Sequence, residues 1–106
     1  MGIFDVLGYK DINKGVEEYR ALSDALLLDV RTPEEYSRGH IPGSINIPLS
    51  SLDEVAFVAE DKNRPLFVHC LSGARSGRAV AELKEMGYAN VKNIGGINHY
   101  RGGLAV

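Results

Sequence analysis

The 106-residue sequence predicts one α/β domain with a mainly parallel sheet and helices on both faces of that sheet. Two short apolar runs, residues 25–30 and 65–70, have the composition of strands that are buried on both faces. Segments with helix-start signals separate the candidate strands, and this alternation requires crossover connections between parallel strands. Hydrophobic residues make up 44% of the chain and charged residues 25%, which is typical of a globular domain with one core. We therefore expect residues 1–106 to form a single domain.

Three further segments carry weaker strand signals. They cover residues 9–12, 44–47 and 91–94. In a parallel α/β sheet, ligands bind outside the carboxyl ends of the strands. The ends of the two strong candidates carry Asp29 and Arg31 on one strand and His69 and Cys70 on the other. We expect a functional site where these two strand ends meet.

Two segments between the candidate strands carry residue patterns typical of a helix N-cap. Thr32 supplies a capping hydroxyl, Pro33 takes the first helical position and Glu35 closes a capping box. Residues 51–54 repeat the capping box without the proline. Both patterns predict helices that begin at these points.

A third helix is expected over residues 76–86. Ala79, Leu83 and Met86 share one face at helical spacing, and Gly87 supplies a left-handed stop. Tyr88, directly after this stop, could fold back onto the last turn of the helix.

Charge and apolar patterning disfavour several functions. Twelve Lys and Arg against fourteen Asp and Glu give a formal net charge of −2. Nucleic-acid-binding domains usually carry a basic excess, so we expect no nucleic-acid partner. No apolar run approaches the roughly 18 residues of a membrane helix, so we expect no membrane partner. His40, His69 and His99 are too widely separated for a zinc site, so we expect no metal.

Cys70 is the only cysteine of the chain. It cannot form an internal disulfide, which fits a reducing compartment, and any covalent adduct of Cys70 must be resolved by an outside partner. Residues 1–5 lack a charged leader followed by a long apolar segment, so they do not predict a secretory signal. We expect a cytoplasmic protein.

The segment that follows the second strong strand carries the clearest chemical signal. Cys70 ends the strand, a loop of small residues follows, and a helix begins near Arg75 or Ser76. In that order the backbone N–H groups of the loop converge above the thiol, and Gly73 can take the positive φ that curls the loop. These donors, the helix dipole and Arg75 should lower the pKa of Cys70. The resulting thiolate would be a nucleophile whose anionic adduct is also stabilised.

A buried core cysteine is the competing interpretation, because a lone cysteine at a strand end usually belongs to the core. The loop of converging donors and the helix start beside Cys70 favour the nucleophile, since a core cysteine needs neither.

Four stretches of the sequence resemble the rhodanese family of domains. They are LDVRTPEEY (residues 28–36), GHIPGSINIP (39–48), CLSGARS (70–76) and VKNIGG (91–96). They occur in the family's order and spacing, and the resemblance covers nearly the whole chain. It implies a three-layer rhodanese-like fold with a five-stranded, mainly parallel sheet and helices on both faces.

The resemblance also implies a sulfurtransferase without a cofactor, in which Cys70 is the catalytic residue. Cys70 would accept a sulfane sulfur as a persulfide from a small-molecule donor, either thiosulfate or a low-molecular-weight persulfide. The acceptor would be cyanide, a thiol or a protein. Asp29 and Arg31 would brace the site. The substrate- and persulfide-binding loop would consist of Leu71, Ser72, Gly73, Ala74, Arg75 and Ser76.

The loop departs from that of thiosulfate-specialised rhodaneses, which is richer in cations. Leu71, Ser72 and Ala74 are neutral, so Arg75 is the only cation of the loop. One charge beside a dianion such as thiosulfate predicts weak binding. A persulfide or a protein is an equally plausible donor, and Leu71 with the loop rim could form a docking surface for a protein acceptor.

Two alternative functions remain. Cysteine phosphatases and the related arsenate reductases use His-Cys, five residues and then Arg, and the dual-specificity cell-cycle phosphatases share the rhodanese fold. Here only four residues separate Cys70 from Arg75, which predicts a tighter ring suited to one added sulfur atom. A noncatalytic rhodanese-like binding module would instead use the loop to capture an anion or a partner.

Side chains around the loop have structural interpretations as well. Arg75 either orients an anionic donor or pairs with Asp29 across the strand ends. Ser76 is more typical of a helix N-cap than of a hydrogen-bond donor to the persulfide. Arg78, one turn beyond Arg75, either adds positive potential at the mouth of the site or, as the simpler interpretation, is a solvated helix residue.

The histidines are interpreted in the same way. We expect His40 to be a hydrogen-bonding turn residue and His69 to be a core histidine with satisfied nitrogens. Tyr100 lies where members of the rhodanese family often carry a tryptophan, and we expect it to fill that space.

Overall fold

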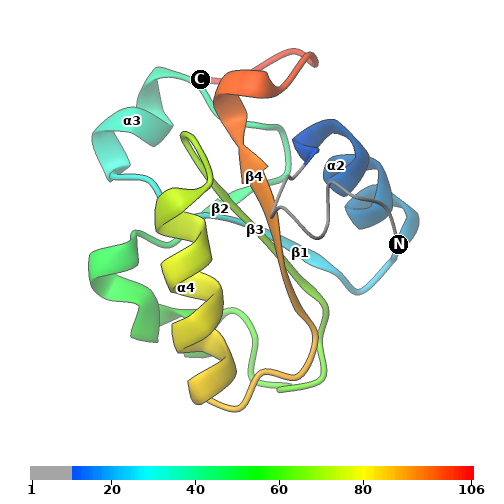
Figure 1. Ribbon diagram of the computed structural model, residues 1–106, viewed down its shortest axis with the longest axis vertical. Helices are drawn as coiled ribbons and strands as arrows, with labels where there is room; N and C mark the ends of the chain where they lie inside the picture. The colour runs from blue at the N-terminus through cyan, green and yellow to red at the C-terminus, as the bar shows by residue number, and fades with distance from the viewer. Residues whose placement is uncertain (1–10) are drawn as a thin grey trace.

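In the computed structural model, which describes residues 11–106, one parallel sheet lies between two layers of helices (Figure 1). The strands are β1 (Leu26–Asp29), β2 (Ile45–Asn46), β3 (Leu66–Cys70) and β4 (Val91–Gly96). Their order across the sheet is β2-β1-β3-β4, so the two strong strand candidates form its centre. Each neighbouring pair is parallel, which confirms the α/β fold class.

Within the described residues the sheet has four strands, whereas the resemblance implied five. The expected strand over residues 9–12 is wrong where it is described, because Asp11 is the N-cap and Ile12 the first residue of helix α2 (Ile12–Ala21). The Asp11 side chain accepts a hydrogen bond of 3.0 Å from the Asn13 N–H, which satisfies one free donor of the first helical turn. Residues 9 and 10 lie outside the described residues.

Helices α2 and α4 (Ala74–Glu85) cover opposite faces of the sheet (Figure 1). The central strands β1 and β3 are buried on both faces, so two hydrophobic clusters form instead of one. The cluster on the side of α4 includes Leu28, Val55, Val68, Cys70, Ala79 and Leu83. The cluster on the side of α2 includes Ile12, Val16, Leu27, Phe67 and Ile94, with Tyr100 packed against it as expected of a space-filling residue.

One of the two expected capping boxes is present. It begins the short helix α3 (Pro33–Arg38). The Glu35 N–H donates to Thr32 Oγ1 at 3.2 Å, and the Thr32 N–H donates to Glu35 Oε1 at 3.0 Å. These two bonds satisfy backbone donors at both ends of the first helical turn.

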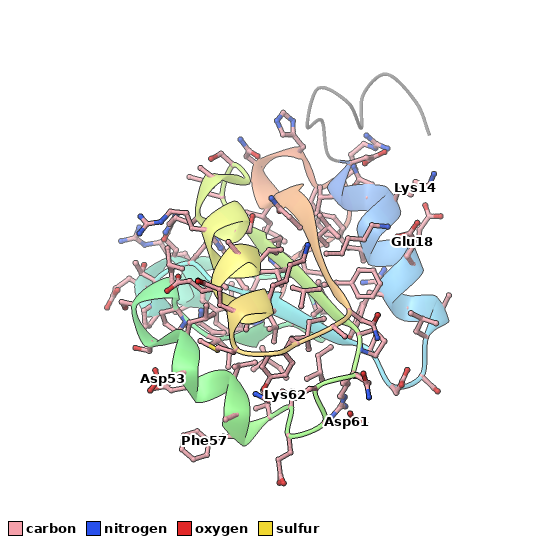
Figure 2. The ribbon with its side chains drawn as sticks, turned by 60° about the horizontal axis from the view of Figure 1, so that its bottom comes forward. Lys14, Glu18, Asp53, Phe57, Asp61 and Lys62 are labelled. Carbon is pink, nitrogen blue, oxygen red and sulfur yellow. The ribbon has the colours of Figure 1, made fainter. Side chains whose placement is uncertain are left out.

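The second capping box, at residues 51–54, is wrong. Ser51 lies inside the 3-10 segment η1 (Leu49–Phe57), at a kink with φ −129° and ψ 36°. The segment begins earlier, because the Ser51 N–H already donates to the Pro48 carbonyl at 2.8 Å. Phe57 projects from the far end of η1 and is 87% exposed (Figure 2).

Helix α4 begins two residues earlier than expected and ends as predicted. Gly73, with φ +106°, is its N-cap, so the cysteine loop runs directly into the first turn. At the other end Gly87 takes φ +101°, the left-handed conformation that the sequence indicated. The Tyr88 N–H then donates back to the Leu83 carbonyl at 3.1 Å. Within residues 11–106, none of the helices has the length and apolar character that crossing a membrane would require.

Candidate active site

Cys70 lies at the carboxyl end of central strand β3, where the sequence places it, and is fully buried. In the sheet it is opposite Gly96, the last residue of β4. The loop that follows Cys70 leads into the N-terminus of α4 at this edge of the sheet (Figure 1). The strand–loop–helix order predicted from the sequence is therefore present.

Three hydrogen-bonding groups surround the Cys70 sulfur. The Gly73 N–H donates to Sγ at 3.0 Å, and the Ser76 N–H donates at 3.3 Å. Ser76 Oγ lies 3.4 Å from the same atom. Because Gly73 is left-handed, its N–H and that of Ser76 can both point at the sulfur. Amides held in this way would also stabilise a negative charge on an atom attached to the sulfur.

These contacts lower the pKa of Cys70. Burial acts in the opposite direction and raises it, but the hydrogen bonds from the Ser76 hydroxyl and from the N–H groups of Ser76, Gly73 and Ser72 outweigh burial. The sequence also predicted a lowered pKa of Cys70, but for partly different reasons. Hydrogen bonds of the loop, rather than the charge of Arg75, are the leading stabilisers of the thiolate.

Ser76 is not the helix N-cap that the sequence favoured. It is the third residue of α4, and its hydroxyl faces the Cys70 sulfur, the Gly73 carbonyl at 3.1 Å and Asn93 Oδ1 at 2.7 Å. Gly73 takes the cap position because only a left-handed residue allows the chain to turn from the loop into the helix.

Asn93 is a member of this network that sequence reasoning missed. Its Oδ1 accepts from the Ser76 hydroxyl and, at 3.0 Å, from the Gly95 N–H, while its Nδ2 donates to the Gly73 carbonyl at 3.2 Å. The available signal was an amide side chain inside a strand candidate. Asn93 thus connects β4 to Gly73 and Ser76 at the start of α4.

Strand β4 also shapes the loop by close packing. A Cβ atom on Gly96 would collide with the Leu71 carbonyl oxygen and with Ser72 Cα. The Asn98 N–H donates to that Leu71 carbonyl at 3.1 Å. Glycine at position 96 therefore allows the start of the loop to lie directly on the end of β4.

Arg75 forms an ion pair with Glu35 of α3, not with Asp29 as one interpretation of the sequence expected. Its Nη1 and Nη2 donate to Glu35 Oε1 and Oε2 at 2.7 and 3.0 Å. The Arg75 hydrogen bonds, opposed by some burial, hold the pKa of Glu35 at about 2. Asp29 does not pair with Arg75, because another cation lies closer to the Asp29 carboxylate.

That cation is Arg31, two residues along from Asp29. Both residues are buried, and Arg31 Nη2 lies 2.7 Å from Asp29 Oδ2. Arg31 also donates to the Gly39 carbonyl at 2.8 Å, which fixes the turn after α3. Burial raises the pKa of Asp29, but the nearby His69 and Arg31 side chains lower it to about 2. The arrangement fits the bracing role that the family resemblance implied.

Neither histidine near the site contacts the sulfur. His69 is fully buried as expected, yet among the described residues its ring nitrogens have no hydrogen-bond partner. Its Nε2 lies 3.4 Å from Asp29 Oδ2, a contact we regard as electrostatic because the alignment does not meet hydrogen-bond geometry. His40 precedes the turn instead of lying in it: its backbone pairs with Ala105 in an isolated antiparallel bridge, its ring stacks on Tyr36, and its Nδ1 lies 2.9 Å from the Tyr36 carbonyl.

A pocket of about 530 Å³ lies between the segment that connects β1 to α3, the start of η1, and α4, and its lining includes Arg75. Leu49 supplies part of the apolar lining, and Arg78 and Glu82 of α4 contribute charges of opposite sign. Arg78 thus lines a cavity instead of only facing solvent. Within residues 11–106, no three His, Cys, Asp or Glu side chains gather as a metal site would require.

Comparison with known proteins identifies relatives. The family model described as Rhodanese-like domain matches residues 10–102. The chain is 46% identical over 71 residues to the thiosulfate sulfurtransferase PspE of Escherichia coli (strain K12), covering 66% of this chain and 68% of that protein. A protein named sulfurtransferase from Allochromatium vinosum is 40% identical over 73 residues, with 69% and 67% covered. The solved structure described as rhodanese with anions from E. coli has a TM-score of 0.72 at 39% identity, covering 76% of this chain and 96% of that one.

Proposed function

Because the chain belongs to the family of rhodanese-like domains, we propose that it is a sulfurtransferase in which Cys70 carries the transferred sulfur. The observation that carries this proposal is the ring of donors around the Cys70 sulfur at the end of β3. Lowering the pKa of Cys70 supplies a nucleophile, and the same N–H groups can bind the anionic product.

The proposed reaction has two steps. The Cys70 thiolate attacks the outer sulfur of the donor, the donor's S–S bond breaks, and a persulfide anion forms on Cys70. With thiosulfate as donor, sulfite leaves with the electron pair of the broken bond. The acceptor then attacks the terminal sulfur, and Cys70 leaves as a thiolate, so the site returns to its starting charge. No step requires a metal or an oxidant.

We propose a small sulfane donor, either thiosulfate or a low-molecular-weight persulfide, and a thiol, cyanide or protein as acceptor. The thiosulfate sulfurtransferase named above supports the first donor. Residues 71–76 would bind the donor and the persulfide, and Asp29 with Arg31 would brace the strand end. We further propose that residues 1–106 act as one domain without nucleic acid or membrane, in the cytoplasm, where a lone cysteine stays reduced.

Mass spectrometry of the intact protein tests this function. After treatment with thiosulfate or glutathione persulfide, the chain should gain one sulfur atom, and cyanide should remove it. Cys70→Ser should gain none, whereas Ser23→Ala, which changes an exposed serine outside the cysteine loop, should still be loaded.

Two outcomes would contradict the proposal. Turnover of an aryl phosphate or arsenate that depends on Cys70, without sulfur loading, would indicate a phosphatase or arsenate reductase. A biological role that survives Cys70→Ser would indicate a noncatalytic binding module.

A further inference from the structure

The ion pair between Glu35 and Arg75 bears on which sulfur donor the site prefers. Arg75 is the only cation in the loop, and its guanidinium makes two hydrogen bonds to one carboxylate. We propose that Glu35 is a specificity-determining residue that neutralises Arg75 and thereby disfavours doubly negative donors relative to singly negative ones. This inference rests on the proposed sulfurtransferase function and concerns the substrate class of the same site.

Glu35 is held in place from two sides. Its Oε1 accepts hydrogen bonds from the Thr32 N–H at 3.0 Å and from Thr32 Oγ1 at 3.2 Å, besides the bond from Arg75. The side chains of Arg75 and Glu35 are 35% and 25% exposed, so water screens the pair only in part. The carboxylate cannot swing away from Arg75 without giving up the capping box of α3.

The pocket beside Arg75 adds no net charge. Arg78 and Glu82 both line it, one positive and one negative. Counting Arg75 with Glu35, the four side chains contribute two positive and two negative charges. The N–H groups of Gly73 and Ser76, which already face the sulfur, are therefore the main attraction for an anion at Cys70. Such dipoles suit one negative charge, and within residues 71–76 a second charge on the donor would meet no cation other than Arg75, which is already paired with Glu35.

Two sulfur donors that differ by one negative charge distinguish the effect of donor charge from the reactivity of the Cys70 thiolate. Thiosulfate is a dianion, and methanethiosulfonate, which also presents a terminal sulfane sulfur, is a monoanion. In both reactions the Cys70 thiolate takes the outer sulfur and becomes a persulfide anion. Sulfite leaves from the first donor with two negative charges, and methanesulfinate leaves from the second with one, so charge balances in each case.

The experiment compares kcat/KM for sulfur loading from these two donors in the wild type and in Glu35→Gln. Glutamine keeps an oxygen acceptor for the Thr32 N–H, so the helix cap is retained while the charge is lost. We expect the ratio of thiosulfate to methanethiosulfonate loading to rise about three- to tenfold, as the removal of one partly exposed charge implies. Added salt should reduce this gain.

Glu34→Gln is the matched control, because it removes the same charge from an exposed neighbour on α3 that does not pair with Arg75. It should leave the ratio at the wild-type value. Arg75→Gln, which exposes the charge of Glu35, should shift the ratio in the opposite direction, below the wild type.

Unchanged ratios in both Glu35→Gln and Arg75→Gln, or an equal rise in Glu34→Gln, would overturn the inference while leaving sulfur transfer intact. If the wild type accepted sulfur from neither these donors nor a persulfide, the proposed function itself would fail.

Discussion

At Cys70, burial and hydrogen bonding act on one sulfur atom in opposite directions. Burial favours the neutral thiol, and the donors of the loop and of the first turn of α4 favour the thiolate. The net lowering of the pKa of Cys70 is thus a difference between two larger effects. Losing one donor should therefore be visible in the reactivity of the thiol.

Ser76→Ala removes the hydroxyl that lies 3.4 Å from the sulfur and keeps the Ser76 N–H donor. We expect the pKa of Cys70 to rise and alkylation by iodoacetamide at pH 7 to slow about three- to tenfold, the value of one hydrogen bond. The measurement is the pH dependence of the alkylation rate. Ser72→Ala is the control and should keep the wild-type profile, since Ser72 acts on Cys70 through its backbone. A wild-type profile in Ser76→Ala would contradict this account.

Asn93 should influence the same sulfur through Ser76. The Ser76 hydroxyl has one proton, and Asn93 Oδ1 is its nearest acceptor at 2.7 Å. Asn93→Asp should hold that proton more strongly and add a negative charge, so we expect alkylation of Cys70 to slow about three- to tenfold.

In a Ser76→Ala background the slowing caused by Asn93→Asp should be smaller, because the effect through the hydroxyl is gone and only the added charge and the lost hydrogen bond to the Gly73 carbonyl remain. An exposed asparagine, Asn90, provides the control for the same chemical change. Equal slowing with and without the Ser76 hydroxyl would show that Asn93 acts on Cys70 by another route.

The sequence was informative about Cys70 and less so about its neighbours. The strand, the cysteine, the glycine and the helix start are each indicated by neighbouring residues, so their order could be predicted from residues 65–76. The partner of Arg75 could not be predicted, because Glu35 lies 40 residues away in the sequence and only the tertiary fold brings it, instead of Asp29, to Arg75. The role of Ser76 changed for a related reason, since Asn93 of β4 draws its hydroxyl into the site.

At the scale of elements, helix α2 shows what the pattern analysis missed. Asp11 as N-cap with Ile12 and Val16 one turn apart were signals for a helix, but residues 9–12 were interpreted as a strand. The kink in η1 has no signal in the sequence. Residues 51–54 fit a capping box, but in the structure the Ser51 N–H donates to the Pro48 carbonyl, so the segment begins before Ser51. The central strands were predictable because each is a continuous apolar run.

Replacing a glycine by alanine should change the free energy of unfolding differently in α2 and in α4. A Cβ on Gly15 would meet Ile94 Cβ and Cγ2 at 2.5 Å, where α2 packs on the buried part of β4. We expect Gly15→Ala to lower the free energy of unfolding by about 1–3 kcal/mol. Gly77 is exposed on α4, and its nearest neighbour would be Asn93 Nδ2 at 3.5 Å, an ordinary contact.

Gly77→Ala should therefore be neutral or raise the free energy of unfolding by about 0.5–1 kcal/mol, through the better helix propensity of alanine. Urea unfolding of both variants checks the pair of expectations. A Gly15→Ala protein as stable as the wild type would mean that α2 can shift on the sheet without cost.

At the scale of the whole molecule, the buried pair of Asp29 and Arg31 links stability to pH. The pKa of Asp29 is about 2 in the folded protein against an ordinary value of 3.8. Because the folded value is the lower one, the ionised carboxylate of Asp29 beside His69 and Arg31 stabilises the fold above about pH 4, and this stability is lost as the pH falls toward 2. The shift corresponds to about 2 kcal/mol at neutral pH.

Urea unfolding between pH 7 and pH 2 measures this dependence. Asp29→Asn should lose about 3–5 kcal/mol at pH 7, since Arg31 is left as an unpaired buried charge, and its stability should fall less steeply below pH 4. Part of the slope will remain, because Glu35 also has a pKa of about 2. An unchanged slope in Asp29→Asn would assign the acid sensitivity to other groups.

Gly96 has a consequence for any attempt to transplant this chemistry. The cysteine loop takes its curvature by packing against β4, a strand that begins some twenty residues later in the sequence. At Gly96 of that strand, the absence of a side chain leaves room for Leu71 and Ser72. A synthetic peptide of residues 66–85 would carry the nucleophile, the left-handed glycine and the helix, yet lack the surface on which they take shape. A graft into another scaffold would have to import the opposing strand as well.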